Sequence, residues 1–111
     1  PNKTYVRTAY LHLLNDFLKL KKTTSARETI VDFLKRFKRD PYREFMEYRL
    51  ATLDELERNI PGQALAEYEN FLQTFPRSRL ADDATLGKAR CLEKLGQNAQ
   101  ALSIYKQFAK T

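Results

Sequence analysis

The sequence predicts an all-α protein of six helices that form three helix–turn–helix repeats. Apolar residues recur at three- and four-residue steps along most of the chain, which is the period of an amphipathic helix. No segment alternates apolar and polar residues with β-branched enrichment, so no sheet is expected. One short pattern returns at intervals of 38 and 37 residues, as in helical repeat proteins. With 111 residues, the chain is expected to form a single domain over residues 1–111.

The first repeat begins with a longer helix, predicted over residues 5–20. Ser25, with Glu three residues later, matches a capping box and is expected to start a shorter helix over residues 26–38. Asp40-Pro41 ends the repeat, since Asp caps helices and Pro fits a first helical turn. The apolar stripe of the longer helix is Val6, Ala9, Tyr10, Leu13, Leu14, Phe17 and Leu18.

The second repeat is predicted as helices over residues 42–59 and 63–75. Ile60-Pro61-Gly62 should break the chain between them, and Pro76 should stop the second helix. Apolar residues follow one side of each helix; they are Phe45, Met46, Leu50, Leu53 and Leu56, then Ala64, Leu65, Tyr68, Phe71, Leu72 and Phe75.

The third repeat is predicted as helices over residues 79–95 and 98–110. Ser78 can cap the first of them, and Gly96 is a natural C-terminal cap. Their apolar residues are Ala81, Ala84, Leu86, Ala89, Leu92 and Leu95, then Ala101, Leu102, Ile104, Tyr105 and Phe108.

The shorter helix of each pair carries the repeated pattern. A small residue is followed four positions later by a large one and three positions after that by an aromatic one. A single pair cannot bury its apolar stripe, so the pairs are expected to stack on one another. The small residues would let helices approach closely, and the aromatic residues would fill the core between pairs. The three copies are Ala26-Ile30-Phe33, Ala64-Tyr68-Phe71 and Ala101-Tyr105-Phe108.

Two stretches resemble the tetratricopeptide repeat family. Residues 86–108 read L-G-x-A-x-x-L-x-x-L-G-x-x-x-x-A-L-x-x-Y-x-x-F, and residues 62–78 read G-x-A-L-x-x-Y-x-x-F-L-x-x-F-P-x-S. The Phe-Pro-x-Ser ending is similar to the bacterial envelope subgroup, which includes the TolA-binding periplasmic protein and the BamD-type outer-membrane assembly lipoproteins. The resemblance implies a right-handed α-α superhelix with repeats at about 5–38, 42–75 and 79–111. Leu14 stands where a small residue is usual, and the register of the second repeat stays open by one residue.

The resemblance also implies a function. Repeats of this family bind a partner peptide or helix on a concave face lined by the first helix of each pair. We therefore expect a non-enzymatic protein-interaction scaffold in envelope assembly or cell division, periplasmic or envelope-associated; a regulatory repeat domain of a larger cytoplasmic protein is the alternative. The expected partner-binding residues are Thr8, Leu11, Asn15, Leu18, Lys19, Phe45, Tyr48, Arg49, Thr52, Asp83, Leu86, Arg90, Glu93 and Lys94, with Glu55 and Leu56 as further candidates.

The positive charge gathers in the first half of the chain. Residues 1–50 hold twelve Lys or Arg against six Asp or Glu, whereas the remainder is balanced and the net charge is +6. Cations at helix ends offset the macrodipole, which is the simpler explanation. The alternative is a site for an acidic partner or single-stranded nucleic acid, with Tyr42 as a stacking ring, although no base-reading motif is present. This basic patch is Lys35, Arg36, Lys38, Arg39 and Arg43.

Catalytic chemistry is disfavoured. Asp82-Asp83 suits the first turn of a helix, where acids favour the dipole, and adjacent acids such as those in Asp54-Glu55 diverge around a helix. Cys91 lies in an apolar helical run and is expected to be buried, and His12 is expected to be an exposed imidazole rather than a catalyst. No phosphate-binding loop, metal-ligand cluster, cofactor motif or membrane-spanning apolar run is present in the sequence.

The last predicted helix should expose apolar side chains. No polar capping helix follows it, and its stripe spans more than one face. The chain is therefore expected to be part of a longer array, with self-association through this helix as the alternative. The residues concerned are Leu102, Ile104, Tyr105 and Phe108.

Overall fold

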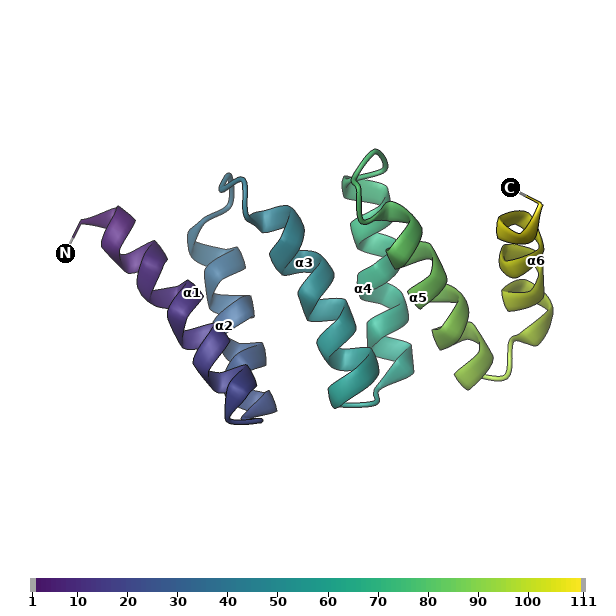
Figure 1. Cartoon of the computed structure of the whole chain (residues 1–111), viewed down its shortest axis with the longest axis horizontal. Helices are drawn as coiled ribbons and strands as arrows, with labels where there is room; N and C mark the ends of the chain where they lie inside the picture. Colours follow the sequence, from purple (N-terminus) through teal and green to yellow (C-terminus); the bar gives the residue numbers. More distant parts are fainter. Residues whose placement is uncertain (1, 111) are drawn as a thin grey trace.

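A computed structural model describes residues 2–110, which fold into six α-helices with no strand among them (Figure 1). The all-α class and the six helices predicted from the sequence are confirmed. In chain order the elements are α1 (Lys3–Lys19), α2 (Thr23–Arg36), α3 (Arg43–Thr52), its π-helical continuation η1 (Leu53–Glu57), α4 (Pro61–Thr74), α5 (Ala81–Lys94) and α6 (Asn98–Ala109).

The helices stand in a row, with α1 at one end and α6 at the other (Figure 1). The array measures 51 × 28 × 19 Å along its principal axes. Consecutive helices pack as the pairs α1–α2, α3–α4 and α5–α6, while α2 also packs on α3 and α4 on α5. The second helix of each of the first two pairs therefore joins its own pair to the next one, which is the arrangement of a helical repeat protein.

The repeated pattern lies in the core, as predicted for the first two copies. Ala26, Ala64 and Ala101 are buried, and Phe33 and Phe71 have no exposed surface. Phe108, the third aromatic position, is only half-buried. The prediction that all three are core residues is therefore wrong for the last one, because no further helix of the described chain covers that side of α6.

The α4–α5 joint is close-packed around a single glycine. A Cβ atom placed on Gly87 would lie 2.4 Å from Cζ of Tyr68, whose ring is completely buried. Any larger residue at this position would push α5 away from α4. The glycine is thus the reason that the second and third pairs can approach so closely.

Several predicted helix boundaries need correction. Helix α2 begins at Thr23, so Ser25 lies inside its first turn and the predicted capping box is wrong. Lys22 is the N-cap residue and provides no side-chain cap. Helix α4 begins at Pro61, two residues earlier than predicted, with the proline at its first position. Helix α5 begins at Ala81 with Leu80 as its N-cap residue and no side-chain cap, so the predicted capping by Ser78 is wrong; Ser78 Oγ instead accepts the Leu80 N–H at 3.0 Å in the turn before the helix.

The turn within each pair contains one residue in the left-handed region of φ. Lys21, Asn59 and Gly96 occupy this turn with φ values of +57°, +54° and +81°. At Gly96 the N–H bonds the Glu93 carbonyl and the next N–H bonds the Leu92 carbonyl, which is a Schellman motif. The predicted role of Gly96 is confirmed, and a lysine takes the equivalent position at Lys21.

The π-helical segment η1 accounts for the open register of the second repeat. Leu14, Ala51 and Ala89 are buried at corresponding places in the longer helices. Lys21 follows Leu14 by seven positions, and Gly96 follows Ala89 by seven. Asn59, however, follows Ala51 by eight. The second pair therefore contains one additional residue, and η1 absorbs it as a π-bulge would.

Candidate functional site

Helices α1, α3 and α5 lie in front of α2 and α4 in Figure 1, and we call their shared surface the front face. These are the first helices of the three pairs, which the sequence analysis selected as the partner-binding surface. The side chains of this face fall into two groups. One group surrounds Tyr48 between α3 and α5, and the other lies between α1 and α3.

Tyr48 and three other predicted binding residues, Arg49, Asp83 and Arg90, come together between α3 and α5. The Tyr48 ring contacts the buried Tyr68 edge-on, with 6.3 Å between ring centroids. Burial raises the pKa of the Tyr48 hydroxyl; the charge of Asp83 raises it further, while those of Arg90 and Arg49 oppose the rise. Tyr48 packs against the core cluster that includes Ala84 and Cys91, the chain neighbours of Asp83 and Arg90 on α5. The structure thus assembles residues from α3 and α5 that are up to 42 positions apart in the sequence.

Arg90 is held in place by a buried carboxylate. Its Nε and Nη2 donate to the two oxygens of Glu55 at 2.7 and 3.0 Å, and the Tyr68 hydroxyl donates to the same carboxylate at 2.7 Å. Burial alone would raise the pKa of Glu55, but the bonds from Arg90 and Tyr68 outweigh it and hold the pKa below its ordinary value. The Arg90 side chain nevertheless stays 42% exposed. A guanidinium fixed on one edge is thereby presented at the surface.

Arg49 is also restrained, on the preceding pair of helices. Its Nη1 donates to Thr52 Oγ1 at 2.7 Å and its Nη2 to Glu57 Oε1 at 3.3 Å. Thr52 itself is buried, so the prediction that it contacts a partner is wrong, and its hydroxyl instead holds Arg49. Arg49 lines a hollow of about 330 Å³ between α1 and α3; the other lining residues are Phe17, Leu18, Lys21, Thr23 and Glu57.

The remaining predicted residues are spread along the same helices. Thr8, Asn15 and Lys19 are exposed on α1, away from the Tyr48 group, and Leu11 is half-buried in the core of the first pair. On the other helices, Phe45, Glu93 and Lys94 are exposed and Leu86 is half-buried. Glu93 accepts the Tyr105 hydroxyl at 2.6 Å.

The sequence did not predict that two carboxylates of the second repeat are buried. Asp54 and Glu55 are 0% and 1% exposed, so the prediction that Glu55 offers a surface contact is wrong. Asp54 points the other way and accepts Arg27 Nε at 3.1 Å and Arg58 Nη1 at 2.9 Å. A signal was available, because the third repeat carries the apolar Cys91-Leu92 in the corresponding stretch.

Glu67 completes this buried cluster as the partner of Asp54. Burial, followed by the hydrogen bond and the charge of Asp54, raises the pKa of Glu67 to about 8. Its Oε1 atom is buried and receives no hydrogen bond, which suits a protonated carboxyl group. Burial alone would raise the pKa of Asp54, but bonds from Glu67, Arg58 and Arg27 hold it below its ordinary value. One proton and one negative charge are thus shared by two carboxyl groups at neutral pH.

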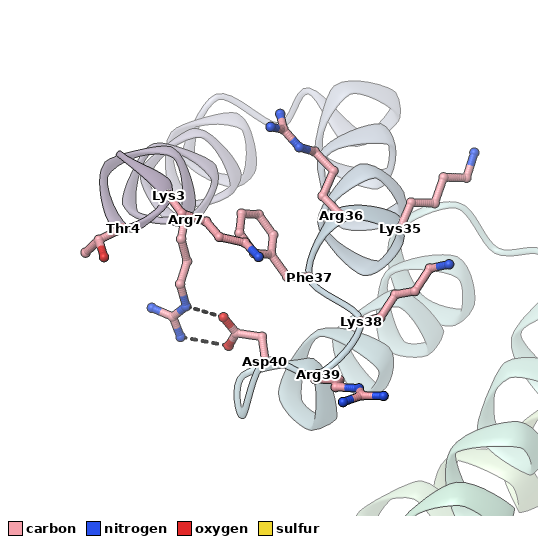
Figure 2. A pocket seen from close by; sticks show the side chains of 9 residues that line it. All are labelled: Lys3, Thr4, Arg7, Lys35, Arg36, Phe37, Lys38, Arg39 and Asp40. Atoms are coloured by element: carbon pink, nitrogen blue, oxygen red, sulfur yellow. Dashed lines mark hydrogen bonds and ion pairs between the residues drawn. The ribbon is translucent and has the colours of Figure 1, made fainter. Parts of the chain in front are cut away.

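The predicted basic patch lies at the other end of the first pair. Lys35, Arg36, Lys38 and Arg39 line a cleft of about 650 Å³, together with residues of α1 (Figure 2). Arg43 turns away from it, since its Nε lies 2.8 Å from Glu47 and its Nη1 donates to the Leu34 carbonyl at 2.7 Å.

The residues weighed for catalysis have ordinary structural surroundings. Cys91 is buried as predicted, and burial raises the pKa of its thiol to about 11. His12 is exposed, and Asp82 and Asp83 lie in the first turn of α5 as expected. Over residues 2–110 no group of three or more His, Cys, Asp or Glu side chains could hold a metal ion, and no helix is long and apolar enough to cross a membrane.

Comparison with known proteins assigns no relative: no protein-family model matches the chain, and no curated protein matches it.

Proposed function

We propose that this chain is a non-enzymatic protein-interaction scaffold that holds a partner segment on its front face. The observation that carries the proposal is Arg90, which is anchored by the buried Glu55 and yet remains 42% exposed. Keeping the charged Glu55 carboxylate inside the core costs desolvation energy. Its two hydrogen bonds from Arg90 orient the exposed guanidinium. Arginine is enriched among the residues that dominate binding energy, and a restrained side chain loses little entropy when a partner binds.

The surroundings of Arg90 favour a peptide or helix that has both acidic and apolar groups. Asp83 and Arg49 add charges of both signs near Tyr48, and Leu86 adds half-buried apolar surface on α5. A groove of mixed character suits a segment laid along it. A partner carboxylate would meet the outward edge of Arg90.

We propose further that the three pairs form a right-handed superhelix of the tetratricopeptide type, with the front face as its concave side. Support comes from the Schellman-type turns at Lys21 and Gly96 and from the buried Ala26, Ala64 and Ala101. A role in the bacterial envelope, in outer-membrane assembly or cell division, rests on the resemblance of residues 62–78 and 86–108 alone. On that ground we propose a periplasmic or envelope location, with a regulatory domain of a larger cytoplasmic protein as the alternative.

The test is to select binding peptides from a random display library and to map their site by NMR. At 13.0 kDa the protein is small enough for its amide signals to be assigned individually. Binding at the front face should shift the amide signals of Tyr48, Arg49, Asp83, Leu86 and Arg90. The proposal is wrong if the selected peptides shift only signals of α2, α4 or α6.

A further inference from the structure

Most of the net charge of the chain converges on one cleft. The cleft lies between the first turns of α1, the last turn of α2 and the turn that follows it (Figure 2). It has six cations and a single carboxylate, a local excess of five positive charges in a chain of net charge +6. Its lining residues are Lys3, Thr4, Arg7, Lys35, Arg36, Phe37, Lys38, Arg39 and Asp40.

The carboxylate is already used inside the cleft. Asp40 forms a two-bond ion pair with Arg7, through Nε and, at 2.9 Å, through Nη2. The hydrogen bond from Arg7 holds the pKa of Asp40 below its ordinary value. Asp40 Oδ1 also accepts the Tyr42 N–H at 2.8 Å, so the pair ties α1 to the turn before α3. Asp40 therefore neutralises Arg7, and within residues 2–110 no other cation of the cleft forms an ion pair, although Arg36 donates to the Tyr10 hydroxyl at 3.4 Å.

The helix macrodipole explains only part of this charge. Lys35 and Arg36 lie in the last turn of α2, where cations are favourable. Lys38 and Arg39 lie beyond the helix, and Lys3 is at the opposite, positive end of α1. Like charges gathered in this way repel one another, so a ligand that supplies negative charge would relieve the repulsion.

The directions of the side chains indicate an extended ligand. In Figure 2 the side chains of Lys35, Lys38 and Arg39 spread away from the end of α2 rather than toward a common point. A compact anion would reach only one or two of them. A chain of phosphates or carboxylates could contact them in succession.

An exposed pair of aromatic rings beside the cleft favours a chain of phosphates, as in a nucleic acid, over a chain of carboxylates, as in an acidic peptide. The rings of Tyr42 and Phe45 lie 5.1 Å apart between centroids, and the two residues are 37% and 39% exposed. The guanidinium of Arg7 lies 5.8 Å from the centre of the Tyr42 ring, which places this pair beside the cleft. Nucleic-acid bases stack on such rings, whereas an acidic peptide gains little from them.

We propose that the cleft and the Tyr42–Phe45 pair bind single-stranded nucleic acid without sequence preference. The cations contact successive phosphates, and the two rings offer a platform for a base. Stacking on aromatic rings is tolerant of sequence, so these contacts distinguish no base from another. The cations of the cleft lie outside the Tyr48 group, whereas Phe45 is also one of the residues predicted for the front face, so the charge variants of the cleft separate this proposal from the peptide-binding one.

The test is the fluorescence anisotropy of a labelled oligothymidylate of about 20 nucleotides, titrated with the protein at several salt concentrations. If three or four cations contact phosphates, the logarithm of the affinity falls against that of the salt concentration with a slope of about −2 to −3. Lys35→Glu combined with Lys38→Glu should weaken binding at least about tenfold and flatten this slope.

The chain offers a matched control for this variant. Lys19 lies in the last turn of α1 and Lys22 three residues later, just as Lys35 and Lys38 are placed at the end of α2. Lys19→Glu combined with Lys22→Glu changes the charge equally at the other edge and should alter binding by less than about threefold. Equal losses in both double variants would overturn the proposal, since only overall charge would then matter. No detectable binding by the unmodified protein at low salt would overturn it as well.

Stacking is tested with Phe45→Ser, a change at a partly exposed side chain whose folding is checked by circular dichroism. It should weaken oligothymidylate binding at least about fivefold without changing the salt slope. Labelled poly-glutamate of similar length serves as the second probe and should bind more weakly. If poly-glutamate binds as tightly as the oligonucleotide, or Phe45→Ser has no effect on the latter, the site takes acidic peptides and the proposal is wrong.

Discussion

Asp54 and Glu67 share the guanidinium of Arg27, which bridges the first and second helix pairs from inside the protein. Its Nε lies 3.1 Å from Asp54, and its Nη2 lies 3.3 Å from Glu67. Asp54 is fully buried, and the Glu67 side chain is 17% exposed with its Oε1 atom buried. The three residues come from η1, α4 and α2, so the cluster fixes the joint between two repeats.

This cluster predicts that stability declines as the solution becomes alkaline. The folded pKa of Glu67 is about 8, above its ordinary value of 4.5. Its contribution is fully present below about pH 4.5 and is lost as the pH rises through about 8. The pKa of Asp54 is lowered, so its contribution to stability depends on pH in the opposite direction. That contribution is lost only in acid, below about pH 4.

Urea melts at pH 6, 7, 8 and 9 should therefore show a falling free energy of unfolding, with a slope of at most about 1.4 kcal/mol per pH unit. Glu67→Gln replaces the protonated acid by a neutral amide and should remove this slope. A wild-type profile that is flat, or a Gln variant with the same slope, would contradict the shared proton.

Removal of the Arg90 side chain should destabilise the fold. Arg90→Ala leaves the charged Glu55 buried without its strongest partner. We expect a loss of about 2–4 kcal/mol, less than for a fully buried pair because the Arg90 side chain is 42% exposed. Combining Arg90→Ala with Glu55→Gln should recover part of the loss in urea melts. A double variant that is less stable than either single variant would show that Glu55 is not stabilised through Arg90.

Phe71 should contribute more to stability than its repeat equivalent Phe108. Phe71 is fully buried and contacts Phe75 and Tyr48, whereas Phe108 is half-buried. Phe71→Ala should cost about 3–5 kcal/mol in a urea melt, the range for an emptied core aromatic site, and Phe108→Ala clearly less. A loss of under about 1 kcal/mol at Phe71 would exclude its role in joining the pairs.

Glycine at the first inter-helix turn should stabilise the protein. Lys21 has a φ of +57°, a conformation that costs a residue with a side chain but not glycine. Lys21→Gly is expected to raise the free energy of unfolding by about 0.5–1 kcal/mol. Lys22→Gly is the control, since Lys22 has a φ of −88° and glycine there should bring no gain. Equal effects of the two changes would contradict the explanation from backbone strain.

The helices and their repeat could be predicted because local sequence determines them. The small residues that begin the repeated pattern, Ala26, Ala64 and Ala101, are buried. Gly96 has a positive φ, a conformation that a residue with a side chain adopts only with strain. The start of α2 was missed because the capping-box match at Ser25 is local, whereas the turn is fixed by the end of α1 at Lys21.

The interior of the site could not be predicted in the same way. Residues 53–58 have the composition of a solvated helix, and Asp54 and Glu55 are kept buried by Arg27 and Arg90, which lie 27 and 35 positions away. The additional residue in η1 turns these acids inward. Asp83 and Arg90 follow the helical period, so the sequence predicted them for the partner-binding face, but it could not predict the ion pair of Arg90 with Glu55, 35 positions away.

The central claim, that a partner lies on the front face, is tested most directly by two neighbouring charge reversals. Asp82 and Asp83 are both exposed in the first turn of α5, and each reversal changes the helix dipole interaction alike. Only Asp83 belongs to the group around Tyr48. The affinity of a display-selected peptide for the two variants is measured by isothermal titration calorimetry. Asp83→Lys should change it at least about fivefold while Asp82→Lys leaves it within about twofold; equal affinities for both variants would contradict the front-face site.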